Sequence, residues 1–305
     1  MKKFIKKLIF FLLPILFVFI GVEFFIRNHP NTFNTKAKQF TENRNMIEVL
    51  FLGSSHTQDG INPRFLEFSA SNLGYAGQDF EIDSALVAHY IKDLRSLKTI
   101  IWEIDFISLY KKREDKYFRY PWYKLFYGLD FGENSMLNDL SLYSSSPDFF
   151  NQYLRNLFFS MDNINQFGFN EAEDKEKFYK LNHDSLAIEQ ASLGENAQLE
   201  GNMYKADNFE KNARLVSYMK QRCEENNIRL VLMAYPKYNT YIRNFEDTPM
   251  YKNWKAFLED ERANGTQVWD LERDKAFLVT DFKNDSHLNQ RGAEKLTKRV
   301  NGLLE

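Results

Sequence analysis

The stretch that decides the fold is Ile47-Glu-Val-Leu-Phe-Leu-Gly-Ser-Ser-His56, a short apolar run that ends in a polar turn. Such a run, bounded by turn residues, is typical of a strand buried on both faces. Three more runs have this character, at residues 97–104, 228–235 and 266–271. Segments with helical spacing lie between or after them, at residues 79–94, 208–226, 252–263 and 290–304. This alternation predicts an α/β fold, with three α/β/α layers built on a parallel sheet.

The carboxyl ends of the predicted strands carry most of the chemically useful side chains. In parallel sheets these ends meet at one edge, where ligands bind. Here they carry Gly53-Ser54-Ser55, Asp105, Tyr235-Pro236 and the loop before His287. We therefore expect a functional site at this edge of the sheet.

The N-terminus predicts a membrane segment. Four lysines within residues 2–7 precede an apolar run from Leu8 to Ile26, which only Pro14, Gly21 and Glu23 interrupt. About twenty apolar residues span a bilayer, and preceding lysines stay in the cytoplasm. No small-x-small cleavage site follows the run. We predict an uncleaved signal anchor at residues 1–27 that makes a single pass of the cell membrane and leaves the rest of the chain extracytoplasmic. A cleaved signal is the alternative.

The remaining chain divides into a linker and a large domain. Residues 28–45 are polar without periodicity, which predicts a linker, and residues 46–305 hold the α/β pattern. The alternation is lost at about 106–206, which predicts an aromatic-rich helical insertion. Its aromatic runs at 117–127 and 149–159 either pack the insertion's own core or line a groove for a sugar chain or a membrane partner.

Composition excludes several classes of function. The net charge of -2 gives no reason to expect a nucleic-acid partner, since phosphate binding needs a basic face. The single cysteine, Cys223, excludes an intramolecular disulfide. Five histidines in no ligand-like cluster argue against a metal site, and we expect no cofactor.

Two segments together predict nucleophilic chemistry. Ser55 lies on the turn that leaves a buried strand, a position that exposes a hydroxyl beside backbone N–H groups. His287 lies on the polar loop 281–292, two residues after Asp285. A serine nucleophile needs a base for its proton, and an acid beside the base fixes the imidazole tautomer. The turn Asn72-Leu-Gly-Tyr-Ala-Gly77 either supplies an oxyanion donor or is an ordinary strand-to-helix turn.

These motifs resemble the SGNH (GDSL-type) hydrolase superfamily over residues 46–105 and 207–305. The resemblance implies that Ser55 is the nucleophile, that His287 is the base, and that the Ser55 amide and Gly77 form part of an oxyanion hole. The commonest family spacing would place the acid at Asn284. Asp285, two residues before the histidine, matches the acid-x-His spacing that the resemblance to alginate O-acetylation proteins implies. We therefore choose Asp285 as the acid, with Asp281 in reserve.

The family's oxyanion asparagine is missing after the strand that ends at Glu103-Ile-Asp105. Asn72 or a residue of the insertion is the expected replacement, and Glu103 and Asp105 either line the site or are structural. We expect the side chain of His56 to point away from Ser55.

The motifs Gly53-Ser-Ser-His and Ser286-His-Leu-Asn resemble the membrane-anchored branch, which includes alginate O-acetylation proteins and the D-alanine transfer protein of teichoic acids. That resemblance implies an O-acyl esterase or O-acyltransferase that acts on a cell-surface polysaccharide, beside a multi-pass membrane acyltransferase. Hydrolysis and transfer stay open. A catalytically silent protein that binds polysaccharide or scaffolds a membrane complex is the alternative.

Overall fold

The computed structural model describes residues 2–112, 117, 119–132, 141–145, 147, 150, 151, 154, 163–172, 176–192 and 206–305. Most of the second aromatic run, at 149–159, lies outside the described residues. The chain forms two compact units. One comprises Met1–Asn34 with Glu114–Asp162, and the larger comprises Thr35–Arg113 with Asn163–Glu305.

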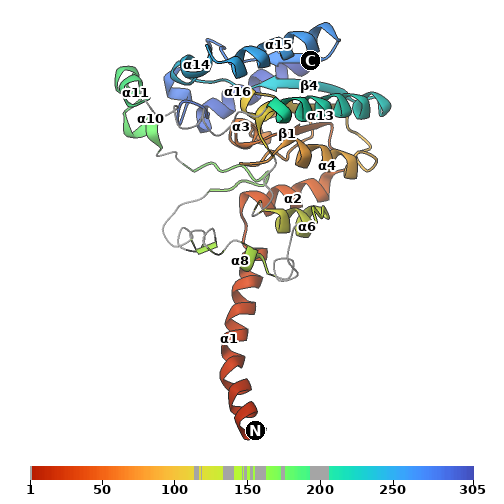
Figure 1. Cartoon of the computed structure of the whole chain (residues 1–305), viewed down its shortest axis with the longest axis vertical. Coiled ribbons are helices and arrows are strands. Elements are labelled where there is room, and N and C mark those ends of the chain that lie inside the picture. Colours follow the sequence, from red (N-terminus) through yellow and green to blue (C-terminus); the bar gives the residue numbers. More distant parts are fainter. Residues whose placement is uncertain are drawn as a thin grey trace. The chain divides into compact units, whose positions relative to one another are not determined.

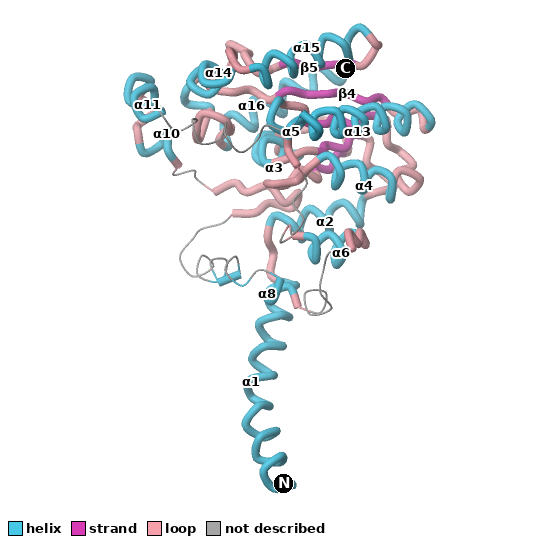
Figure 2. Tube along the Cα trace, in the orientation of Figure 1, coloured by secondary structure: helices cyan, strands magenta, loops and turns pink. Residues whose placement is uncertain are grey.

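The larger unit is built on a five-stranded parallel sheet in the order β2-β1-β3-β4-β5 (Figures 1 and 2). The strands are β1 (Val49–Leu52), β2 (Ala70–Asn72), β3 (Thr99–Glu103), β4 (Arg229–Ala234) and β5 (Gln267–Asp270). Four of them match the predicted runs. The pattern misses β2, because its Ala-Ser-Asn sequence is short and polar although all three residues are buried.

Alternate residues of each strand face different helical layers. Phe51 and Ile101 pair in register and share a buried cluster with Leu296 of α16 (Gln290–Leu304). Trp102, next along β3, packs its ring 4.5 Å from that of Phe80 in α4 (Phe80–Tyr90). Each face of the sheet is therefore covered, and the predicted three-layer α/β/α fold is confirmed.

The other elements of this unit join or flank these layers (Figure 1). The first layer also holds α3 (Ser55–Gly60), which packs on α16, and α13 (Ala206–Glu225) packs on α4 in the second. The remaining elements are η1 (Pro63–Phe65), α5 (Phe106–Tyr110), α10 (Lys177–Lys180), α11 (Ser185–Ser192), α14 (Asn239–Phe245), α15 (Pro249–Ala263) and η2 (Val279–Asp281).

The predicted linker is wrong in part, because residues 32–43 form helix α2 (Thr32–Asn43). Phe33, Ala37 and Phe40 recur at helical spacing and are all buried. Lys36 on the same helix is buried as well, and its ammonium donates to the carbonyl of Gly74 at 2.7 Å. The stripe is hard to detect in sequence because a lysine and polar residues surround three apolar positions.

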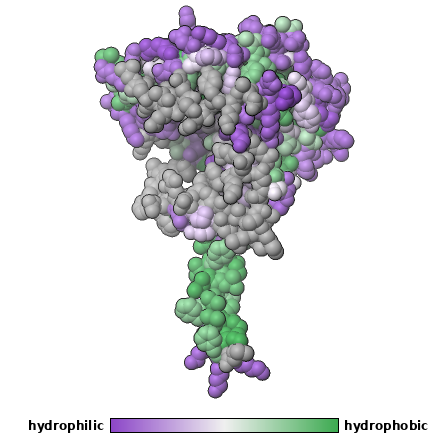
Figure 3. Space-filling view, viewed as in Figure 1, coloured by the Kyte–Doolittle hydropathy of each residue, from purple (hydrophilic) through white to green (hydrophobic). Residues whose placement is uncertain are grey.

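The smaller unit begins with α1 (Lys2–Asn28), a 27-residue helix long and apolar enough to cross a membrane. Figure 3 shows its surface as hydrophobic along most of its length, with hydrophilic residues at its start. Glu23, the one acid of the apolar run, accepts hydrogen bonds from the N–H of Leu142 at 2.8 Å and the hydroxyl of Ser141 at 3.0 Å. It therefore stabilises the start of α8 (Leu142–Ser145).

Aromatic rings of the first predicted run pack on one another within this unit. Helix α6 (Tyr120–Tyr127) places Trp122 and Tyr123 around Phe33, with ring centroids 5.2 and 5.0 Å from it. Trp122 also stacks on Phe150 at 5.6 Å. For these described residues, the contacts agree with the first alternative, in which the aromatic rings pack a small core.

Candidate active site

The turn between β1 and α3 presents Ser55. Gly53 has φ +138°, and a Cβ there would lie 2.3 Å from Cβ of Glu103. Only glycine fits this backbone. The buried Glu103 carboxylate accepts hydrogen bonds from the N–H and hydroxyl of Ser54, at 2.7 and 2.5 Å, and from the hydroxyl of Thr57 at 2.8 Å. Glu103 therefore fixes the turn on both sides of Ser55.

The structure brings Ser55 and His287 together from sequence positions 232 residues apart. Oγ of Ser55 lies 2.8 Å from Nε2 of His287. The loop that carries the histidine closes through an isolated bridge between Phe282 and Leu288, and Asn289 accepts the N–H of Gly292 to start α16. This geometry suits the transfer of the serine proton to the imidazole.

The other ring nitrogen of His287 faces an amide. Nδ1 lies 3.1 Å from Oδ1 of Asn284 and 2.8 Å from the hydroxyl of Ser286. The Nδ2 group of Asn284 donates to Glu176 at 2.9 Å, which turns the amide oxygen toward the ring. Nδ1 can then donate to that oxygen, and Nε2 is left to accept the serine proton.

Neither predicted acid occupies the position beside Nδ1. Among the described residues, the Asp285 carboxylate makes no hydrogen bond to the ring, and its carbonyl accepts the N–H of Tyr238 at 2.9 Å. Asp281 is fully buried in ion pairs with Arg291, at 3.1 Å, and Lys295. The geometry corrects both assignments in favour of Asn284, because the loop orients the residue three positions before the histidine toward the ring.

Positive neighbours and burial keep His287 neutral. Burial lowers the pKa of this imidazole well below its ordinary value, and the positive charge of the His56–Lys237 pair and of Lys283 lowers it further. A neutral imidazole is the form that accepts a proton.

The two predicted oxyanion-hole residues, Asn72 and Gly77, make different contacts in the structure. Asn72 is a structural residue, because its buried amide donates at 2.8 Å to the carbonyls of both Thr57 and Ile61 and accepts the N–H of Gly74. Gly77 has φ +82°, and its carbonyl accepts the ammonium of Lys111 at 2.6 Å. The proposed role of Gly77 as a donor in an oxyanion hole stays a prediction.

A buried charged cluster lies behind the Ser55–His287 pair. Nδ1 of His56 lies 2.8 Å from Glu103 and 3.4 Å from Asp105, its Nε2 contacts the ammonium of Lys237, and its ring stacks on that of His287 at 4.6 Å. Burial raises the pKa of Glu103, but the positive charge of the His56–Lys237 pair and hydrogen bonds from His56 and Ser54 outweigh it and lower that pKa to about 2.

His56, Glu103 and Asp105 place potential ligand atoms within 4.8 Å of one another. The ammonium of Lys237 already supplies a cation to this cluster, 3.8 Å from Asp105, and Glu103 already accepts several hydrogen bonds. We therefore interpret the cluster as an ion-pair network and not as a metal centre. Lys237 was not predicted as part of the site, because a lysine after a strand is most often exposed.

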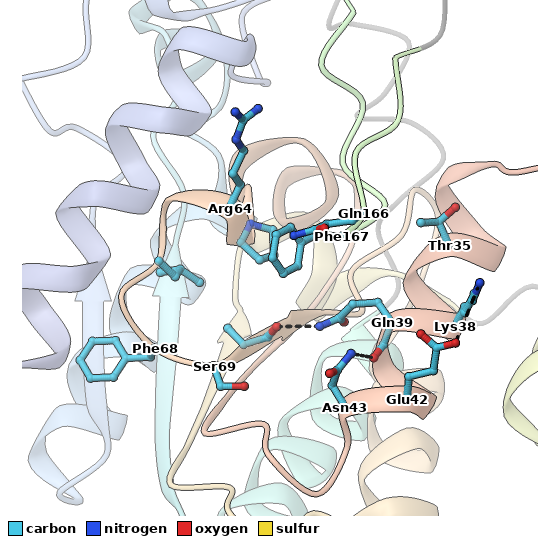
Figure 4. A pocket seen from close by; sticks show the side chains of 13 residues that line it. Thr35, Lys38, Gln39, Glu42, Asn43, Arg64, Phe68, Ser69, Gln166 and Phe167 are labelled. Atoms are coloured by element: carbon cyan, nitrogen blue, oxygen red, sulfur yellow. Dashed lines mark hydrogen bonds and ion pairs between the residues drawn. The ribbon is translucent and has the colours of Figure 1, made fainter.

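A pocket of about 620 Å³ lies between α2, η1 and the 166–167 turn (Figure 4). None of the residues that line it belongs to the Ser55–His287 pair. Its charged side chains have partners, since Lys38 pairs with Glu42 at 3.9 Å and Arg64 with Glu171 at 3.1 Å. We assign this pocket no ligand.

Comparison with known proteins yields structural matches of low similarity. No family model and no curated protein matches the chain. A GDSL-like lipase from Bacteroides thetaiotaomicron matches with a TM-score of 0.39 and 10% identity, over 89% of this chain and 100% of that one. A candidate acylhydrolase from Bacteroides fragilis matches with the same score and identity, over 88% and 97%. Similarity this low carries no argument about activity, so the assignment rests on the geometry above.

Proposed function

We propose that this protein is a serine-dependent enzyme that hydrolyses or transfers O-acyl groups through an acyl-serine intermediate. The observation that carries the proposal is the 2.8 Å contact between Oγ of Ser55 and Nε2 of His287 at the carboxyl edge of the sheet. In the proposed reaction Ser55 attacks the acyl carbonyl while His287 takes its proton. The imidazolium then protonates the departing alcohol.

The proposed setting is a membrane surface. The lysines and apolar length of α1 support a single-pass anchor with an extracytoplasmic domain. The motif resemblance to alginate O-acetylation and D-alanine transfer proteins supports an O-acylated cell-surface polysaccharide as substrate, with a multi-pass acyltransferase as partner. Whether water or a sugar hydroxyl receives the acyl group distinguishes hydrolase from transferase.

The test is covalent labelling of the full-length protein in detergent with a fluorophosphonate, followed by peptide mass spectrometry. We expect the adduct on Ser55, with its loss in Ser55→Ala and a strong decrease in His287→Ala. Ser217→Ala is a control for loss of a serine hydroxyl on an exposed helix face, and it should keep the adduct.

A second candidate is a silent SGNH-like domain that binds polysaccharide or scaffolds a membrane complex. The amide of Asn284 beside Nδ1, where a carboxylate would stabilise the imidazolium, favours this candidate. A folded protein that fails to label at Ser55 over a wide pH range would support it against the enzyme.

A further inference from the structure

Lys237 is a buried charged residue near the site, and its side chain is only 2% exposed. It lies two residues after Tyr235, on the segment that leaves β4. Its ammonium contacts Nε2 of His56, donates to the carbonyl of Ser286 at 3.3 Å and lies 3.8 Å from Asp105. It thus joins three segments of the site: α3, the end of β3 and the histidine loop.

An ammonium removed from water is costly unless opposite charge compensates it. Burial lowers the pKa of Lys237, while Asp105, Glu103, Glu272 and Asp285 all act to raise it. The negative charge of these four acids favours the protonated, positively charged form of Lys237.

The contact between Lys237 and His56 also limits how many protons the two groups carry. Two N–H donors cannot hydrogen-bond to each other, so this pair carries at most one positive charge. With Lys237 as the donor, His56 accepts at Nε2 and donates from Nδ1 to Glu103. The ring oriented in this way stacks on His287, with an angle of 28° between the planes.

The charged groups that face His287 come from several elements. His56 lies on α3, Lys237 follows β4, and Lys283 and Asp285 flank the histidine on its own loop. Glu103 and Asp105, at the end of β3, form ion pairs with His56 and Lys237. The side-chain ammonium of Lys237 both carries charge and donates to the backbone of the loop, at the carbonyl of Ser286.

We propose that Lys237 is a positioning residue for the Ser55–His287 pair, which holds positive charge behind the imidazole and fixes the loop that carries it. The inference rests on the proposed role of His287 as the base. The charge disfavours a second positive charge on His287, so the imidazole stays ready to accept the serine proton. The bond to the Ser286 carbonyl keeps Nε2 directed at Ser55.

The test compares Lys237→Met with Lys220→Met in the full-length protein in detergent. Lys220 is a matched control, because it also donates to a main-chain carbonyl, that of Asn264, but on an exposed surface. The rate of fluorophosphonate labelling is measured from pH 4 to pH 9. We expect the acid limb of the Lys237→Met profile to move up by about one pH unit or more, while the control matches the wild type. A slower rate at every pH with an unmoved limb would mean that Lys237 is only structural.

Lys237→Met leaves acids without their cation and risks misfolding, so Asp105→Asn supplies a second measurement of opposite sign. Asparagine caps a helix as well as aspartate does, and α5 should keep its start. Loss of this negative charge should move the acid limb to lower pH. An unmoved limb in folded Asp105→Asn would overturn the proposal.

If the proposed enzyme function is wrong, the wild-type protein will not react with the fluorophosphonate at all, which distinguishes that outcome from failure of the Lys237 inference. In that case the pH dependence of diethyl pyrocarbonate modification at His287, measured by peptide mass spectrometry, tests the same shifts without catalysis. An identical midpoint in the wild type, Lys237→Met and Asp105→Asn would overturn the electrostatic role of Lys237.

Discussion

His287 has no carboxylate as a partner for Nδ1. The amide of Asn284 can orient the imidazole and select its tautomer, but it stabilises the imidazolium less than an anion would. Because positive neighbours also disfavour that cation, the site suits a base that must be neutral before it acts.

Asn284→Ala tests this arrangement directly. It removes the acceptor at Nδ1, so the ring can rotate or change tautomer, and we expect the labelling rate of Ser55 to fall about tenfold or more. Asp285→Ala is the matched control on the neighbouring residue, and at pH values above the acid limb its rate should change little. The reverse order of effects, measured by labelling kinetics, would restore Asp285 as the acid.

The pH dependence of labelling follows from the lowered pKa of His287. A base works in its unprotonated form, and an ordinary histidine loses that form below a pH of about 6.5. Since burial and nearby cations lower this pKa, the neutral form persists to lower pH. The wild-type acid limb should therefore lie clearly below pH 6.5 in a rate profile. A midpoint at or above 6.5 would contradict the environment described for His287.

At the scale of elements, the site depends on the tight turn from β1 into α3. Glu103 at the end of β3 binds this turn, and helix α16 begins just after the histidine loop. The turn has no room for a side chain at Gly53.

Gly53→Ala should destabilise the protein by about 2–4 kcal/mol, from the positive φ and the overlap with Glu103 together. Gly265→Ala is the matched control, with φ +83° and no atom within 4 Å of the added Cβ. It should cost about 1 kcal/mol. Chemical denaturation of the two variants measures the difference, and equal losses would mean that the turn relaxes around the new Cβ.

At the scale of the whole molecule, α1 is either a retained membrane anchor or a cleaved signal sequence. A cleaved signal sequence could have the same length and composition as an anchor. The buried contacts of Glu23 with Ser141 and Leu142 favour retention of the helix, because cleavage would remove their acceptor.

We expect the full chain, expressed in a bacterial host, to remain in the membrane fraction after alkaline carbonate extraction. Deletion of residues 2–27 should release it, since the apolar segment is the only described helix able to span a bilayer. A C-terminal alkaline phosphatase fusion should be active only when α1 is present, which would locate the domain outside the cytoplasm. A mature chain shortened at its N-terminus would show a cleaved signal instead.

The sequence by itself determined the α/β class, the apolar N-terminal helix and the strand edge that holds Ser55 and His287. It could do so because burial imposes periodic apolar patterns that do not depend on distant partners. Tertiary structure decided that Asn284 faces the imidazole and that Asn72 binds backbone carbonyls. It also brought the buried Lys237 beside His56. These outcomes depend on the direction of side chains on folded loops and on charges that meet only after folding, and no local pattern records either.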